Sequence, residues 1–237
     1  MTALLEIRSV AVRFGGVMAL SGVDLDVQKD SITGLIGPNG AGKTTLFNVI
    51  CGIRQPTTGV VLLDNKEING VPTQKRSAMG IGRTFQRLEL FTTLSVFDNV
   101  LVAAELARVS NPHAVAREQI ELLGLTDRTD TIAGELPTGS ARLLEVARAL
   151  AGRPRLLLLD EPASGLDDVE TQQLGVLLQQ LKSLGITVLL VEHDMSLIMK
   201  VCDQIHVLDL GNVIASGTPD QIQHNPSVID AYLGAVR

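Results

Sequence analysis

Residues 37–44 constrain the chain most, because their sequence Gly-Pro-Asn-Gly-Ala-Gly-Lys-Thr fits the pattern G-x-x-x-x-G-K-[ST] at every fixed position. Glycines let successive backbone N–H groups turn inward around phosphate oxygens, since no Cβ blocks the turn. The apolar run 32–36 predicts a strand before this stretch, and residues 45–50 predict a helix after it. The N-terminal dipole of that helix would face the same phosphates. The sequence therefore predicts a phosphate-binding loop between a strand and a helix.

The loop pattern also assigns a candidate role to each of its side chains. Lys43 can reach the β- and γ-phosphates of a nucleotide, and the Thr44 hydroxyl can ligate Mg²⁺. We therefore expect ATP and Mg²⁺ as ligands, with a nucleotide-binding set that comprises Gly37, Pro38, Asn39, Gly40, Ala41, Gly42, Lys43, Thr44 and Thr45.

Composition excludes several classes of protein. The 237 residues are 45% hydrophobic, as expected for a globular chain of one or two domains. A net charge of −6 and an aromatic content of 3% without Trp argue against a nucleic-acid partner. The longest apolar runs are too short to span a bilayer, and we expect no signal peptide at the N-terminus. Cys51 and Cys202 lie far apart and predict buried thiols in a reducing compartment.

Periodicity predicts a helical block inside an α/β chain. Apolar spacing turns helical from residue 94 to about 123, with Ser95 as N-cap and a turn at 110–112. A third helix is predicted over 141–151. Strands are predicted on both sides of this block, at 5–14, 23–27, 59–64, 81–85, 156–159 and 186–191.

The last two of these strands are continuous apolar runs, which is typical of parallel strands covered on both faces. Residues 169–183 predict the crossover helix between them, and the stretch from Thr218 predicts two short helices. No repeat, low-complexity segment or flexible linker divides the chain.

Two carboxylates follow the apolar run 156–159. Asp160 stands at the strand end, where an aspartate can organise the metal shell of a nucleotide. Glu161 comes next and can polarise the attacking water. We therefore expect Asp160 and Thr44 around the metal.

Several further segments resemble the motifs of nucleotide-binding subunits of ATP-binding-cassette (ABC) transporters, in the family's order and nearly from end to end. They are Arg13-Phe14-Gly15-Gly16, Thr84-Phe85-Gln86, Glu161-Pro162-Ala163-Ser164-Gly165-Leu166-Asp167 and Val191-Glu192-His193-Asp194. The resemblance implies a single α/β domain with a P-loop NTPase (RecA-like) core, an N-terminal antiparallel β region and an inserted α-helical subdomain. Residues 1–88 and 151–237 would form the core with its β region, and about 89–150 the helical subdomain.

The same resemblance implies roles for individual residues. Phe14 would stack on adenine, Gln86 would lie near Mg²⁺ and the water, and His193 would sense the γ-phosphate. Glu161 and His193, with Gln86, are thus the candidate catalytic residues. The D-loop would consist of Ser164, Gly165, Leu166 and Asp167.

The segment Leu136-Pro137-Thr138-Gly139-Ser140 departs from the family signature L-S-G-G-Q. In the family this segment clamps the nucleotide of the opposite subunit through a serine hydroxyl, glycine N–H groups and a helix dipole. Gly139 and the helix from about Ser140 retain the dipole here, whereas Thr138 or Ser140 would have to supply a hydroxyl from a displaced position. One composite ATP site is therefore expected to be weaker than the other.

Segments 12–20, 83–86, 99–104, 217–219 and 225–234 are similar to importers of branched-chain amino acids, and importers of urea and short amides share them. The resemblance implies a second ABC ATPase subunit, identical or homologous, and integral membrane permease subunits. It further implies a solute-binding protein as an indirect partner, and a peripheral location on the cytoplasmic face of the membrane. A coupling helix of the permease would enter a groove near residues 86–97.

Three other functions remain open at this point. A soluble ABC ATPase usually carries two cassettes or long coiled coils, and this chain has neither. A small-molecule kinase would leave the D-loop and His193 unexplained. A module that holds ATP with little turnover is disfavoured by Glu161 and left open by the altered signature.

Overall fold

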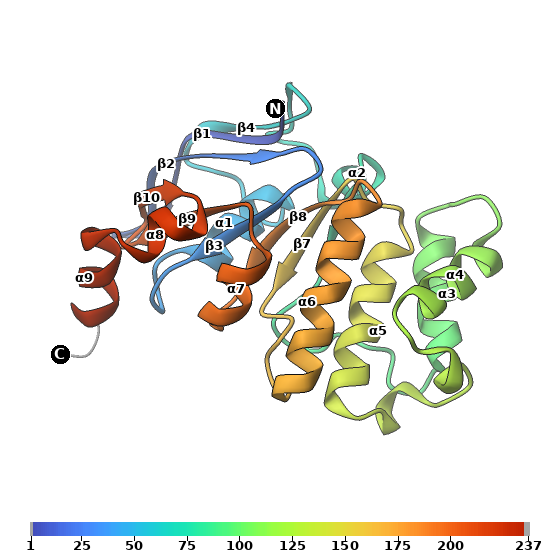
Figure 1. Cartoon of the computed structure of the whole chain (residues 1–237). Helices are drawn as coiled ribbons and strands as arrows, with labels where there is room; N and C mark the ends of the chain where they lie inside the picture. Colours follow the sequence, from blue (N-terminus) through green and yellow to red (C-terminus); the bar gives the residue numbers. More distant parts are fainter. Residues whose placement is uncertain (1, 235–237) are drawn as a thin grey trace.

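Two β-sheets organise the chain, as the computed structural model of residues 2–234 shows (Figure 1). The larger sheet has the order β10-β9-β3-β8-β7-β6. Its β9, β3, β8, β7 and β6 run parallel, and β10 pairs antiparallel with β9 at one edge. These strands are β3 (Ile32–Ile36), β6 (Ile81–Arg83), β7 (Leu156–Asp160), β8 (Thr187–Val191), β9 (Gln204–Asp209) and β10 (Asn212–Gly217).

The smaller sheet is antiparallel and lies over the first, as expected for the N-terminal region (Figure 1). Its order is β2-β1-β4-β5, from β1 (Ala3–Phe14), β2 (Val17–Gln28), β4 (Thr58–Leu63) and β5 (Lys66–Glu67). β2 is longer than the predicted strand 23–27, because its first half pairs with β1 through several register shifts that break the alternation.

Helices α3 (Val96–Leu106), α4 (Pro112–Leu122) and α5 (Thr138–Leu150) lie between β6 and β7 in the sequence. The Ser95 side chain accepts from the Asp98 N–H, so the predicted N-cap is confirmed. Helix α6 (Asp168–Ser183) is the crossover between β7 and β8, also as predicted. The other helices are α1 (Lys43–Ile50), α2 (Thr73–Ala78), α7 (Met195–Val201), α8 (Pro219–Gln223) and α9 (Pro226–Gly234), with 3-10 turns at Thr126–Arg128 and Ala133–Glu135.

The structure differs from the prediction at the start of one helix and in two strands that were not predicted. Helix α5 begins at Thr138, with Pro137 as N-cap, rather than at residue 140 or 141. Its first turn, Thr-Gly-Ser, has no apolar residue, so the periodicity could not include it. The strands β9 and β10 were not predicted. The apolar run of β9 is interrupted by the buried polar His206, and that of β10 by exposed polar positions.

Successive residues of the central strands divide between two apolar cores. Leu157 and Leu159 of β7 join the core that contains Val100, Ile120 and Leu144 of the helical segment. Their neighbours Leu156 and Leu158 join a second core with the antiparallel sheet and α1. Because the side chains of a strand alternate between faces, the central sheet joins both layers. The phosphate loop with α1 and the helical segment α3–α5 therefore pack on opposite faces of one sheet.

The described residues include no helix long and apolar enough to span a membrane. Cys51 and Cys202 are both buried and free, as predicted. Burial raises the pKa of the Cys202 thiol to about 12, so this thiol is protonated and unreactive at neutral pH.

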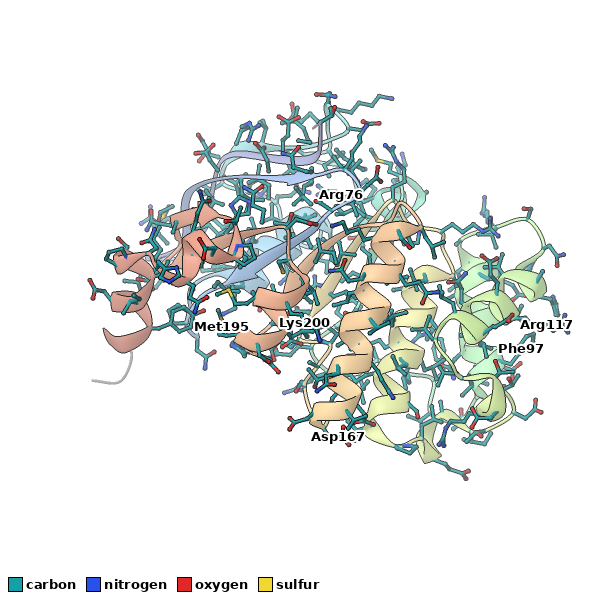
Figure 2. All side chains as sticks on the ribbon, viewed as in Figure 1. Arg76, Phe97, Arg117, Asp167, Met195 and Lys200 are labelled. Atoms are coloured by element: carbon teal, nitrogen blue, oxygen red, sulfur yellow. The ribbon has the colours of Figure 1, made fainter. Side chains whose placement is uncertain are left out.

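Arg76 on α2 is 1% exposed and lies beneath the antiparallel sheet (Figure 2). Its guanidinium donates to four backbone carbonyls: Val49 (2.7 Å), Ile50 (2.8 Å), Ile68 (2.6 Å) and Val71 (2.9 Å). The first two belong to the last residues of α1, whose carbonyls have no partner within the helix. A positive charge is also favoured at that end of the helix dipole. Arg76 therefore holds the far end of the helix that begins at the phosphate loop.

Replacing Arg76 by Met should leave the Ile50 and Val71 carbonyls without a donor, because the other two also accept the backbone N–H groups of Gly52 and Val71. We expect the free energy of unfolding to fall by about 2 kcal/mol or more, since each buried unsatisfied group costs about 1–3 kcal/mol. Denaturation by urea would measure it, with Lys75→Met on the exposed side of α2 as the control. A loss no larger than that of the control would show that water or another side chain replaces the guanidinium.

Candidate functional site

The predicted phosphate loop joins β3 to α1 and has the expected backbone. Gly40 and Gly42 have positive φ values of 80° and 110°. A Cβ on Gly42 would lie 2.7 Å from the Ala19 carbonyl oxygen, so the turn requires glycine there. Lys43 is 7% exposed, and its Nζ donates to the carbonyls of Gly37 (2.6 Å) and Pro38 (3.0 Å). Thr44 is exposed at the first turn of α1.

Two effects act on the charge of Lys43. Burial lowers the pKa of its ammonium, and the carboxylates of Glu161 and Asp160 oppose that shift. The lysine of the loop and the acidic pair after β7 are therefore close enough in the structure for their charges to interact.

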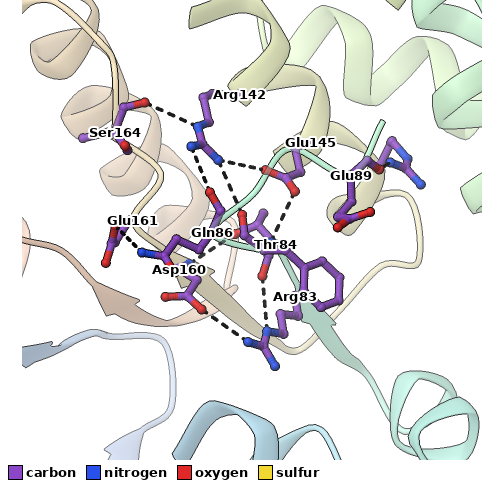
Figure 3. Close-up of polar contacts among 12 residues, drawn as sticks. Arg83, Thr84, Gln86, Glu89, Arg142, Glu145, Asp160, Glu161 and Ser164 are labelled. Atoms are coloured by element: carbon purple, nitrogen blue, oxygen red, sulfur yellow. Dashed lines mark hydrogen bonds and ion pairs between the residues drawn. The ribbon is translucent and has the colours of Figure 1, made fainter. Parts of the chain in front are cut away.

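Asp160 ends β7 and is 2% exposed. Its backbone N–H donates to the Thr84 hydroxyl (3.2 Å), and its Oδ2 lies 3.2 Å from Nη2 of Arg83 (Figure 3). Burial raises the pKa of Asp160, and the neighbouring Arg83 lowers it. Arg83 also donates to Asn48 Oδ1 of α1 (2.7 Å). The guanidinium therefore links the aspartate to the helix of the phosphate loop.

Two side chains from two other loops contact the Glu161 carboxylate. Its Oε2 accepts from Gln86 Nε2 at 3.1 Å, and its Oε1 lies 2.8 Å from His193 Nε2. These residues are distant in the sequence: Gln86 follows β6, Glu161 follows β7 and His193 follows β8. The side chains of Gln86 and His193 are thus each within hydrogen-bond distance of the Glu161 carboxylate.

The backbone aims the Glu161 side chain. Glu161 has a φ of 53°, in the left-handed region that is unfavourable for a side chain with a Cβ. Its N–H still donates to the Val191 carbonyl at 2.9 Å, so the strand pairing continues for one residue beyond Asp160 before the chain turns. The turn directs the carboxylate away from the sheet and towards Gln86 and His193.

Glu192 supports the neighbouring turn. It is 4% exposed and accepts from the N–H groups of Ala163 (2.5 Å) and His193 (3.0 Å). Burial raises the pKa of its carboxyl, and these N–H groups lower it. Asp167 then caps α6 in a reciprocal capping box with Glu170, at the end of α6 that Figure 2 marks. The predicted D-loop is therefore fixed at both ends.

Phe14 is 47% exposed and stands at the end of β1. The guanidinium carbon of Arg54 lies 4.4 Å from the centre of its ring, and Arg54 Nη2 donates to the Arg13 carbonyl at 3.2 Å. The Arg54 guanidinium thus stacks on the Phe14 ring and also donates to the backbone of the residue before it.

The altered signature segment forms the first turn of α5. Gly139 is buried, and a Cβ there would collide with Glu170 of α6. Thr138 and Gly165 of the D-loop are also neighbours, since a Cβ on Gly165 would lie 3.1 Å from Thr138 Cγ2. The signature segment and the D-loop therefore pack against each other within the same chain.

Sequence analysis missed Arg54, Arg83 and Glu192. Each acts on a residue that the motifs did identify, namely Phe14, Asp160 and His193. For Glu192 a signal was present, because it is an acidic residue directly after a buried strand and next to a candidate catalytic histidine. Arg54 and Arg83 carry no such pattern.

A cavity of about 520 Å³ opens beside this site, between α2, β6, α3 and α5. Its lining is mainly apolar and includes Ile53, Phe85 and Leu106, which are exposed, together with Arg83, Glu89 and Arg148. It overlaps the beginning of the groove expected near residues 86–97 and extends from there towards α2.

Known proteins resemble this chain throughout. The family described as "ABC transporter" matches residues 20–164, and the family described as "Branched-chain amino acid ATP-binding cassette transporter" matches residues 212–236. The chain is 43% identical to the "High-affinity branched-chain amino acid transport ATP-binding protein BraF" of Pseudomonas aeruginosa, over 98% of both chains. It is 40% identical to the corresponding LivG of Escherichia coli, again over 98% of both. It is 32% identical to the "Lipopolysaccharide export system ATP-binding protein LptB" of Haemophilus influenzae, with the same coverage.

Solved structures agree with this likeness. A nucleotide-free ATP-binding cassette from an ABC transporter has a TM-score of 0.90 and 29% identity, over 98% of this chain and 99% of that one. An ATP-binding cassette in its ADP conformation has a TM-score of 0.90 and 30% identity, over 99% and 100%. A dimeric cassette bound to ADP and phosphate has a TM-score of 0.81 and 26% identity, over 91% and 98%.

Proposed function

We propose that this chain, which belongs to the ABC transporter family of ATP-binding proteins, is the ATP-hydrolysing subunit of an importer for branched-chain amino acids. The observation that carries the ATPase activity is the meeting of Gln86, Glu161 and His193 beside the loop of Lys43. The importer class is supported by the BraF and LivG relatives and by the match of residues 212–236. Importers of urea and short amides are the alternative class.

Lys43 and the loop amides would bind the phosphates of ATP. On binding, the ammonium would exchange its bonds to the Gly37 and Pro38 carbonyls for phosphate oxygens. The adenine would stack on Phe14, whose ring is held by Arg54. The positive end of α1 adds to the attraction for the phosphates.

The residues present fit Mg²⁺. The described part of the chain contains no cluster of three or more His, Cys, Asp or Glu side chains that could hold a metal ion by itself. Mg²⁺ commonly binds through one or two carboxylates together with substrate phosphates and waters, which suits Asp160, Thr44 and Gln86. When bound, the ion would neutralise charge that develops on the phosphates.

Glu161 would accept the proton of the attacking water, since its carboxylate is directed away from the sheet and is 16% exposed. Its hydrogen bond from Gln86 and its contact with His193 orient it. His193 would then interact with the γ-phosphate, because its ring is 49% exposed and borders the same space.

A second cassette would complete each site. Thr138, Gly139 and Ser140 stand at the first turn of α5, where free N–H groups and the helix dipole favour a phosphate of the opposite subunit. Ser164, Gly165, Leu166 and Asp167 would meet the same partner. The apolar cavity lined by Ile53, Phe85 and Leu106 would receive a helix of a permease subunit, at the cytoplasmic face of the membrane. A solute-binding protein would contribute only indirectly.

Lys43→Ala should weaken ATP binding by about 1.5–3 kcal/mol, the value of a lost charge-assisted hydrogen bond. Calorimetry with ATP and Mg²⁺ measures the change, and Lys200→Ala, at an exposed position of α7, is the control. Equal affinities for the wild type and Lys43→Ala would reject the role of the loop lysine.

Glu161→Gln should retain ATP binding and lose roughly 10²-fold or more in turnover, the usual size of a general-base effect. The amide can still bond to Gln86 and His193 but accepts no proton from water. Phosphate release measures the loss, and Glu118→Gln on the surface is the control. Near-normal turnover would point to another base, with His193 next.

The altered signature should make this chain favour a non-identical partner. Two copies would place two weak clamps over two complete phosphate loops, so the ATP-loaded Glu161→Gln protein should remain monomeric in light scattering. Adding Pro137→Ser, Thr138→Gly and Ser140→Gln should produce ATP-dependent dimers. A tight homodimer formed with the native segment would show that Gly139 and the helix dipole suffice.

A further inference from the structure

One buried guanidinium contacts both loops that carry the candidate catalytic residues. Arg142 lies on α5, one turn after the signature segment, and is 9% exposed. Its Nη2 donates to the Gln86 carbonyl (3.0 Å), its Nη1 to the Phe85 carbonyl (3.4 Å) and its Nε to the Ser164 carbonyl (3.4 Å). Figure 3 shows these bonds converging on Arg142 from the loops after β6 and β7.

Glu145, three residues further along α5, contacts both Arg142 and the loop after β6. Its Oε2 lies 3.5 Å from Arg142 Nη1, and its Oε1 accepts from the Phe85 N–H at 3.3 Å. Three residues further along α5, Arg148 donates to the Glu89 carbonyl and lies 4.8 Å from the centre of the Phe91 ring. The stripe at 142, 145 and 148 therefore binds residues 85–91. Among the three, Arg142 also has a bond to the loop after β7.

Apolar packing could not replace this arrangement. Removing a guanidinium from water is costly unless its donors are satisfied, and here each bond satisfies a loop carbonyl as well. The Gln86 carbonyl belongs to the residue whose side chain donates to Glu161, and Ser164 lies three residues after Glu161. Fixing both carbonyls fixes the separation across which the Gln86–Glu161 bond forms.

We propose that Arg142 is a positioning residue, which holds the Gln86 loop and the D-loop in register with the helix that begins at the signature segment. This inference rests on the proposed ATPase function. Through Arg142, a phosphate at the first turn of α5 in one site would influence the Gln86–Glu161 geometry in the other. Arg142 acts through the backbone carbonyls of Gln86 and Ser164, to which its guanidinium donates.

Hydrogen exchange of the full-length chain tests the proposal directly. The reporter amides are Phe85, which donates to Glu145, and Ser164 and Leu166, which donate to the carbonyls of Glu161 and Ala163. Arg142→Met should speed exchange roughly tenfold in both loops, as expected for losing bonds to a charged group. Glu145→Leu, which removes the acceptor of the Phe85 N–H, should do so only at Phe85. Arg153→Met, which removes an exposed arginine paired with Glu118, should change neither.

Kinetics separate positioning from general loss of structure. Arg142→Met should bind ATP with a Kd within about twofold of the wild type and lose about 10- to 100-fold in turnover, because small displacements of catalytic groups cost this much. Arg142→Lys keeps the charge but not the fork of donors, so it should show the same pattern more mildly. It also serves as the test if the Met variant does not fold.

Two results would overturn the inference: unchanged exchange at Ser164 and Leu166 in both Arg142 variants, or wild-type turnover in either variant. A wild-type chain that binds ATP but never hydrolyses it, alone or with a second cassette, would instead refute the proposed ATPase function. In that case the exchange measurements would still decide whether Arg142 links the two loops.

Discussion

The register of the parallel strands β6, β7 and β8 determines the geometry of the site. Asp160 pairs with Val191, and Arg83 pairs with Leu158, so the three strands end at one edge within a few residues of each other. One further backbone bond, from Glu161 to Val191, extends the ladder before the chain turns. A slip of one residue would move every side chain of β7 to the opposite face and exchange the two apolar cores. The cores therefore fix the catalytic geometry.

The strained backbone of Glu161 follows from this register. A left-handed residue with a Cβ costs about 1–2 kcal/mol. The surrounding contacts offset it: Glu161 has its own backbone bond to Val191, and Glu192 holds the Ala163 N–H two residues later. Strain of this kind persists only where neighbouring structure overdetermines the conformation. Here it directs the carboxylate into the space between Gln86 and His193 instead of along the strand.

Sequence patterns predicted those features of the fold and the site that depend on a few neighbouring residues. The glycines of the loop, the Ser95 cap and the apolar run before Asp160 each carry their signal within a few residues. Arg76, Arg83 and Arg142 were missed because their partners lie 26, 77 and 56 residues away at Ile50, Asp160 and Gln86. An arginine on a helix or a strand gives the same pattern whether it faces solvent or a buried oxygen. The start of α5 was missed for the related reason that Thr-Gly-Ser has no apolar periodicity.

The formal charges around the phosphate loop cancel before a nucleotide binds. Lys43 and Arg83 carry two positive charges, and Asp160 and Glu161 carry two negative ones, so their formal sum is zero before ATP binds. The phosphates of ATP add several negative charges to a site where burial already raises the pKa of Asp160. Lys43 alone cannot neutralise them, and Arg83 is held by Asp160 and Asn48. A divalent cation near Asp160 and Thr44 would supply the further positive charge that the proposed ATP site needs. Arg142, bonded to neutral carbonyls and to Glu145, stands outside this balance, so its contribution is to geometry rather than to the field at the phosphates.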